Sequence, residues 1–224
     1  QHIIKLGSVL LNFMKYDSII QNLTRRFKMY VSAKCHLRSN SKYSQSRPYQ
    51  VEKKPRETPG DYEKRTWRER LHLSYENPEK IQIPGMQFKN CIAECAKYMS
   101  RQIPGKGKTT YTKHFEAGIM PMGSMELDIY AKDVIEEVVF VPSSGKRGDG
   151  NRVYKSFPVI NSWEGVIEFS IFDHTITKEV FIEHLIEAGQ FIGIGRWRPR
   201  NNGMYGRFLV EKVDWQENES AIAA

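Results

Sequence analysis

The residues at positions 191–207 are of types that bind phosphate groups and nucleobases. This stretch holds four glycines, four arginines, Trp197 and Tyr205, and it contains no acidic residue. Glycine lets main-chain N–H groups approach a ligand closely, and the planar guanidinium of arginine matches the oxygens of phosphate. Aromatic rings offer faces on which unpaired bases stack. A single-stranded nucleic acid would use all three properties, so the candidate binding residues are Gly193, Gly195, Arg196, Trp197, Arg198, Arg200, Gly203, Tyr205, Gly206 and Arg207. The alternative is a β-hairpin whose arginines are only solvated.

Basic charge is grouped along the chain rather than spread evenly. The formal net charge is +8, with basic clusters at 38–70, 101–113 and 146–155 and acidic stretches at 116–137 and 164–187. Grouped charge predicts a basic face that steers and holds a polyanion. Because phosphate contacts carry no sequence information, we expect sequence-independent binding that weakens with salt. The further candidate contacts on this basic track are Arg47, Lys89, Lys106, Lys108, Lys146 and Arg147.

Two kinds of catalytic or cofactor site are excluded by spacing. The segment 103–110 (IPGKGKTT) resembles a phosphate-binding loop, but the nucleotide-hydrolase pattern needs glycine where Gln102 stands. No histidine pair or Cys/His cluster has the spacing of metal ligands. We therefore expect neither a metal ion nor another cofactor.

The composition bounds the domain organisation. With 224 residues and 40% hydrophobic content, the chain can bury one main core. We expect 29–215 to form a single domain with an insertion at 38–80 and a polar tail at 216–224. Residues 1–28 end in Arg25-Arg26-Phe27-Lys28, whose codons can form a ribosome-binding sequence before Met29, as in an over-extended bacterial or phage reading frame. These residues are then an untranslated leader; the alternative is an amphipathic helix that packs on the domain.

The cysteines and the apolar runs indicate the compartment. Cys35, Cys91 and Cys95 are an odd number without a zinc-type partner pair, which indicates three reduced thiols in a cytoplasmic protein. No apolar run reaches the roughly 20 residues of a membrane span.

The periodicity of apolar residues predicts an α+β domain. Strands are expected at 29–37, 137–141, 153–160, 166–172 and 208–215, extended pieces at 111–119 and 124–130, and helices at 86–99 and 177–191. A short helix near 61–71 is expected inside the insertion, with Tyr62, Trp67 and Leu71 packing. The resulting β-α-β-β-α-β order is the ferredoxin-like arrangement, which the RNA-recognition motif shares.

Two of these segments together resemble the repeat-associated mysterious protein (RAMP) superfamily, the RNA-binding subunits of CRISPR effector complexes. Ile83-Pro84-Gly85 and Lys89 match the family's entry to its first helix, and the glycine- and arginine-rich stretch matches its C-terminal loop. Met86-Gln87-Phe88 stands where small residues are usual, Asn90 replaces a glycine, and the loop carries an Arg-Pro-Arg-Asn-Asn insertion. The resemblance covers the element order of 29–215 but only these two segments in residues.

The resemblance implies a ferredoxin-like core that binds guide-type RNA along its backbone, as a subunit of a ribonucleoprotein in antiviral defence. It also implies self-association or contact with other effector subunits, with 38–70 reaching the RNA and the next subunit. One alternative is a metal-independent RNA-processing endonuclease of the same superfamily with His36 and Tyr43 as acid and base. Others are a phage single-stranded DNA-binding or recombination protein, and a basic face that meets an acidic partner protein.

Overall fold

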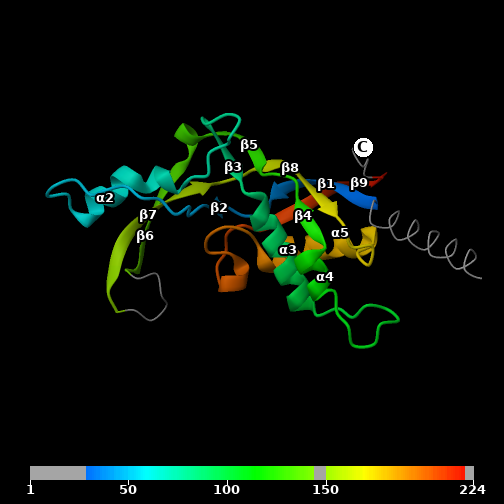
Figure 1. Ribbon diagram of the computed structural model, residues 1–224. Helices are drawn as coiled ribbons and strands as arrows, with labels where there is room; N and C mark the ends of the chain where they lie inside the picture. The colour runs from blue at the N-terminus through cyan, green and yellow to red at the C-terminus, as the bar shows by residue number, and fades with distance from the viewer. Residues whose placement is uncertain (1–28, 144–149, 220–224) are drawn as a thin grey trace, which may run out of the picture.

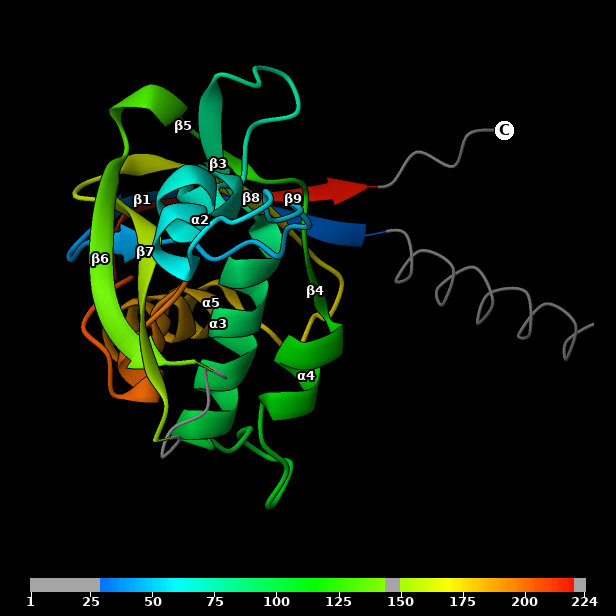
Figure 2. The ribbon, with the colours of Figure 1, turned by 90° about the vertical axis from the view of Figure 1, so that its left-hand side faces the viewer.

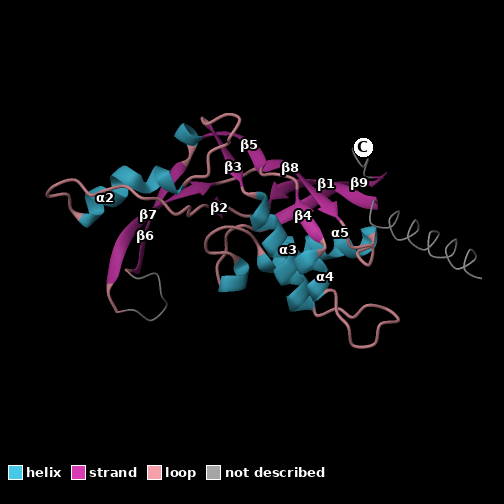
Figure 3. Ribbon diagram, in the orientation of Figure 1, coloured by secondary structure: helices cyan, strands magenta, loops and turns pink. Residues whose placement is uncertain are grey.

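The computed structural model describes residues 29–143 and 150–219, which form an α+β protein with three antiparallel sheets (Figure 3). The largest sheet has the strand order β4-β8-β1-β9. Its strands are β1 (Met29–Ser39), β4 (Ile119–Pro121), β8 (Glu164–Ile171) and β9 (Phe208–Glu219). β1 pairs with both β8 and β9, so the first and last strands lie side by side, with β1 inside the sheet and β9 at its edge.

Two helices pack against one face of this sheet. α3 (Gly85–Met99) and α5 (Lys178–Glu187) follow β3 and β8 in the chain. Their buried residues recur at helical spacing and form one core with the inward-facing residues of β1, Ala33, Cys35 and Leu37. The alternate residues of β1, Lys34, His36 and Arg38, therefore lie on the opposite face. The expected strands and helices of this core are confirmed.

Three boundaries differ from the sequence expectation. Residues 112–117 form a helix, α4 (Thr112–Ala117), where an extended piece was expected. Buried Tyr111, Phe115 and Ile119 recur every four residues, which is helical and not strand spacing. α5 ends in a π-helical turn at Ala188–Ile192. β9 continues through Glu219 because residues 216–219 pair with β1, so the polar segment after Trp215 begins as strand.

The remaining strands form two smaller sheets. β2 (Tyr43–Ser44), β7 (Arg152–Ile160) and β6 (Ile135–Pro142) make one, and β3 (Lys80–Ile83) and β5 (Met125–Tyr130) make the other. Short 3₁₀ turns lie at Ala131–Asp133 and Pro199–Asn201. The tip of the β6–β7 hairpin, with Lys146 and Arg147, lies outside the described residues.

The insertion carries its own helix and is anchored to the core. α2 (Pro59–Thr66) is capped by the Thr58 side chain and continues into a 3₁₀ turn at Trp67–Arg70. Trp67 and Leu71 are buried as predicted, while Tyr62 is only half-buried. Figure 1 shows α2 and the β6–β7 hairpin extending to one side of the molecule, with residues 193–207 between the hairpin and α3.

The short helix α4 lies beside α3 (Figure 2). Cys35, Cys91 and Cys95 are buried and unbridged. Within residues 29–143 and 150–219, every helix is too short or too polar to cross a membrane.

Candidate nucleic-acid interface

Residues 193–207, here called the Gly/Arg loop, fold onto the chain segment that follows β1. The Arg196 N–H donates to the Ser44 carbonyl at 2.9 Å, and the Gly206 N–H donates to the Lys42 carbonyl at 2.7 Å. The Arg207 N–H donates to Ser41 Oγ at 2.9 Å. The loop is therefore fixed along most of its length by main-chain hydrogen bonds.

The loop glycines are required by this close packing. Gly195 has φ 75°, and a Cβ there would lie 2.4 Å from the Tyr43 ring and 2.6 Å from the Ser44 carbonyl. A Cβ at Gly206, with φ 77°, would lie 1.9 Å from the Ile194 carbonyl. The Gly193 N–H, expected to face a phosphate, donates to the Ala188 carbonyl at 2.9 Å. These glycines shape the loop and bring it against β2.

Three of the four loop arginines are paired with carboxylates, against the expectation of free cations. Arg196 lies 3.0 Å from Glu137 of β6 and stacks on the Phe157 ring at 3.9 Å. Glu94 of α3 pairs with both Arg198 and Arg200, at 2.8 and 3.1 Å. Arg207 donates to the Gln190 carbonyl at 3.1 Å. The acidic partners come from distant segments, so the acid-free stretch did not reveal them.

The two loop aromatics differ in exposure. Tyr205 is buried and donates to Glu137 Oε1 at 2.5 Å. Burial and this hydrogen bond raise the pKa of Tyr205 to about 12, so the phenol stays neutral. Trp197 is 42% exposed and lies edge-on to Tyr205. Of the two predicted stacking residues, only Trp197 presents its ring to solvent.

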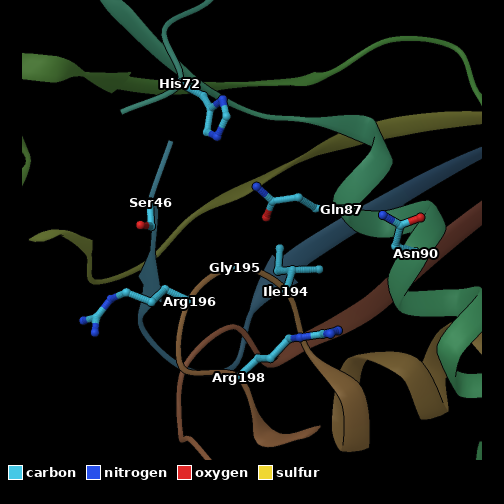
Figure 4. Close-up of a pocket in the computed structure, with 8 residues that line it drawn as sticks. All are labelled: Ser46, His72, Gln87, Asn90, Ile194, Gly195, Arg196 and Arg198. Atoms are coloured by element: carbon cyan, nitrogen blue, oxygen red, sulfur yellow. The ribbon is translucent and has the colours of Figure 1, made fainter. Parts of the chain in front are cut away.

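A groove of about 360 Å³ lies between the Gly/Arg loop and the first turns of α3 (Figure 4). It brings together the two segments that carry the RAMP resemblance, although they are far apart in sequence. Its walls are Gln87 and Asn90 of α3, Ser46 and His72 of the insertion, and Ile194, Gly195, Arg196 and Arg198 of the loop. Burial, and to a smaller extent the Arg47 guanidinium, lowers the pKa of His72, which favours its neutral form.

A second hollow of about 530 Å³ continues along the exposed side of α3. It shares Asn90 with the groove and is lined by Lys89, Asn90, Ala93, Glu94, Lys97, Tyr98, Glu116 and Arg200. We call it the α3 hollow. Within the described part of the chain, Lys89 and Lys97 form no ion pair, and they lie on one helix face at i and i+8. Tyr98 stacks on Phe191 at 6.1 Å, and both rings are about half exposed.

The other predicted contacts lie at different distances from this surface. Lys106 and Lys108 are exposed on the turn that follows α3, beyond the end of the α3 hollow. Arg47 lies in the insertion, where it donates to the Glu69 carbonyl at 3.2 Å. Lys146 and Arg147 lie outside the described residues.

The candidate acid–base pair is not assembled. Tyr43 is fully buried in the core, and burial raises its pKa far above the usual range. His36 lies on the opposite face of β1, with Nε2 3.2 Å from Asp214 Oδ2. The two side chains cannot act on one bond, so the endonuclease alternative loses its proposed residues.

Several lining residues were missed by the sequence analysis. Gln87 and Asn90 appeared there only as departures from the family pattern, and His72, Lys97, Tyr98 and Phe191 were not selected. For Gln87, Asn90, Lys97 and Tyr98 the available signal was the polar face of α3, where these positions recur between the buried ones, whereas His72 and Phe191 lie on other segments. Among the described residues, no group of three His, Cys, Asp or Glu side chains could hold a metal ion.

Comparison with known proteins finds no family model and no curated protein that matches the chain. Similar solved structures include a chain of the Type III-B Cmr-beta complex bound to cognate target RNA. It has a TM-score of 0.47 and 11% identity over 91% of this chain and 66% of that chain. Cmr6 from Pyrococcus furiosus has a TM-score of 0.44 and 12% identity, over 80% of this chain and 98% of that one. A chain of a CRISPR RNA-guided surveillance complex has a TM-score of 0.34 and 8% identity, over 82% of this chain and 67% of that chain.

These neighbours are of the kind that the two sequence motifs indicated. Each TM-score lies below 0.5.

Proposed function

We propose that the protein binds single-stranded RNA along the exposed side of α3, from the groove at its start to the basic turn after its end. The proposal depends most on the observation that the groove and the α3 hollow are neighbours along α3, because Asn90 lines both. Lys89 and Lys97, eight residues apart, are separated by about 12 Å along the helix axis. Lys106 and Lys108 lie on the exposed turn that follows α3 in the chain. An extended polyanion fits this row of cations better than a compact ligand does.

Stacking would add to these phosphate contacts. Tyr98 and Phe191 form an exposed aromatic pair beside Lys97, and Trp197 offers a further exposed ring. Each base stacked on such a ring contributes roughly 1–3 kcal/mol. Because three of the four Gly/Arg loop arginines already have carboxylate partners, we assign the loop the role of groove wall, with its backbone shape as the main contribution.

A ferredoxin-like core is part of the same proposal. The order β4-β8-β1-β9, with helices between the first and second and between the third and fourth of these strands in the chain, supports it. We further propose that the protein works as a subunit of a ribonucleoprotein, with other subunits or further copies of itself as partners. The insertion and the β6–β7 hairpin, which extend from the core, are the segments available for such contacts.

Titration of labelled single-stranded RNA at increasing salt tests the proposal. Four neutralised phosphates predict a log–log slope of about −3, which is about a 50-fold loss of affinity between roughly 50 and 200 mM salt. A flat response would contradict it. Parallel titrations with single-stranded DNA of the same sequence distinguish an RNA-binding protein from the DNA-binding alternative.

Paired variants locate the surface. Lys89→Ala with Lys97→Ala should weaken binding by tenfold or more at low salt and bring the slope to about −1.5. Lys34→Ala with Lys212→Ala removes the same charge from the exposed sheet face and should leave the affinity within about twofold. Equal losses in the two double variants would indicate non-specific attraction to net charge.

A further inference from the structure

A chain of buried polar side chains leads from the insertion into the groove. Gln45 and Tyr43 are fully buried, and Gln87 stands at the groove wall. Gln45 Nε2 lies 2.8 Å from the Gln82 carbonyl and 3.5 Å from Tyr43 Oη, and Tyr43 Oη lies 2.9 Å from Gln87 Oε1. Such a network has a direction, because each group in it either donates or accepts.

The main chain of His72 sets that direction. Its N–H, which can only donate, lies 2.7 Å from the Gln45 carboxamide and therefore identifies the nearer atom as Oε1. The other end of Gln45 is then the amino group, which donates to the Gln82 carbonyl and faces the oxygen of Tyr43. The phenol proton of Tyr43 is directed to Gln87 and makes Oε1 the atom that accepts it. Tyr43 remains protonated at neutral pH because burial raises its pKa.

The result is that Gln87 presents its amino group to the groove. Gln87 Nε2 makes no hydrogen bond to another described residue, and Figure 4 shows the side chain between His72 and the loop residues Ile194 and Gly195. The carboxamide of a free glutamine could turn over and present either end. Here the bond from Tyr43 holds one orientation, so the groove offers a fixed donor at this point.

The charges of the groove walls are compensated. Arg196 is paired with Glu137 and Arg198 with Glu94, at 3.0 and 2.8 Å. His72 is favoured in its neutral form because burial lowers its pKa. A phosphate would meet no uncompensated cation on these walls, whereas a neutral acceptor would meet the Gln87 amino group. The volume, about 360 Å³, lies within the range of small-ligand sites.

We propose that this groove seats one base of the bound strand and that Gln87 donates a hydrogen bond to the carbonyl at position 4 of uracil, with Tyr43 and Gln45 as positioning residues. The inference rests on the RNA-binding function proposed above and adds a base preference to it. Uracil and cytosine have the same size and differ at position 4, where uracil carries an acceptor oxygen and cytosine a donor amino group. The groove should therefore favour uridine over cytidine.

The test compares the affinities of oligo(U) and oligo(C) RNA for the whole protein. One additional hydrogen bond predicts a U-over-C ratio of about threefold to tenfold. Gln87→Glu exchanges the donor for an acceptor at a solvent-open position and should lower or reverse the ratio. Tyr43→Phe leaves Gln45 bonded to the Gln82 carbonyl but releases the Gln87 carboxamide, so the ratio should fall towards one while the average affinity changes little.

Gln216→Glu is the matched control, because it adds the same charge at an exposed site on β9 and should leave the ratio unchanged. Circular dichroism melts check that each variant is folded. Equal binding of U and C by the unmodified protein, or a Gln87→Glu ratio equal to that of Gln216→Glu, would overturn the base preference and leave RNA binding standing. Failure to bind either oligonucleotide would overturn both proposals.

Discussion

The exposed face of the central sheet and the surface along α3 are both rich in basic residues, but their charges are arranged differently. On the sheet, Lys34 pairs with Glu168, His36 with Asp214, Arg38 with Glu211 and Lys212 with Asp214. The partners of the three β1 residues lie on the neighbouring strands β8 and β9, whereas Lys212 and Asp214 are two residues apart on β9, so charges within the sheet neutralise this face. Along α3, the arginines are paired but Lys89 and Lys97 form no ion pair with another described residue, and the surface is hollowed.

The comparison shows that the number of basic residues in a segment does not identify a polyanion site. The RNA-recognition motif binds bases on aromatic residues of its sheet. Here the corresponding outward positions of β1 are Lys34, His36 and Arg38, each with an acidic partner. Unpaired lysines, exposed rings and a groove occur together along α3, which is why we place the RNA there.

The largest expected effect is a loss of stability when a side chain is added where the Gly/Arg loop packs closely against β2. Gly195→Ala should cost roughly 3 kcal/mol or more, because its Cβ would overlap the Tyr43 ring and the Ser44 carbonyl. This corresponds to a fall of about 6–12 °C in Tm, measured by circular dichroism. RNA affinity should fall with it, since one wall of the groove is displaced.

Gly105→Ala is the control for this substitution. Gly105 has the same φ of 75°, but no atom lies within 4 Å of the position of its Cβ. It should lose only the roughly 1–2 kcal/mol of the left-handed backbone conformation. Equal Tm losses in the two variants would mean that the close packing of the loop on β2 contributes nothing to the stability of the fold.

An intermediate effect, on RNA affinity, is expected when the paired arginines lose their carboxylate partner. Glu94→Gln removes the carboxylate shared by Arg198 and Arg200, so both guanidinium groups become available at the α3 hollow. RNA affinity should increase by about tenfold, the equivalent of one charge-assisted hydrogen bond, with a steeper salt dependence. Glu168→Gln on the sheet likewise releases Lys34 and should change RNA affinity little. An increase of the same size for Glu168→Gln would remove the distinction between the two surfaces.

The smallest effect concerns pH. The pKa of His72 is lowered by burial and by Arg47, so its positive charge appears only as the pH falls below about 6.5. RNA affinity should therefore rise by about threefold between pH 7.5 and roughly 5.5, as expected for one partly screened charge. His72→Gln should abolish this rise, whereas His36→Gln on the sheet should preserve it. The titration is limited to pH values at which circular dichroism shows the folded protein.

Much of the central fold could be predicted from local patterns. Alternating apolar residues located β1, β8 and β9, and four-residue spacing located α3 and α5. α4 was missed because strand-like residues such as Tyr111 and Ile119 outweighed the helical spacing that they share with Phe115. The extension of β9 through Glu219 was missed because residues 216–219 are polar. They pair with the start of β1 through backbone hydrogen bonds, which form whatever the side chains are.

The binding surface was predicted less completely, for a physical reason. The Gly/Arg loop and the start of α3 were both selected, and the structure places them around one groove. The charge state of the loop could not be predicted, because Arg200 and its partner Glu94 are 106 positions apart in the chain. The fixed orientation of Gln87 depends on hydrogen bonds among Tyr43, Gln45 and His72. These residues come together only in the folded chain, so no local sequence pattern indicates the contact.

Glu137 of β6 connects the β6–β7 hairpin with the Gly/Arg loop. It belongs to the β6–β7 hairpin, which projects from the body, and it binds both Arg196 and Tyr205 of the Gly/Arg loop. A force that bends the hairpin would be transmitted through this carboxylate, and through the contact of Arg196 with Phe157 of β7, to the groove wall beside Gln87. The proposed contacts with a neighbouring subunit and the proposed choice of base would then be mechanically connected.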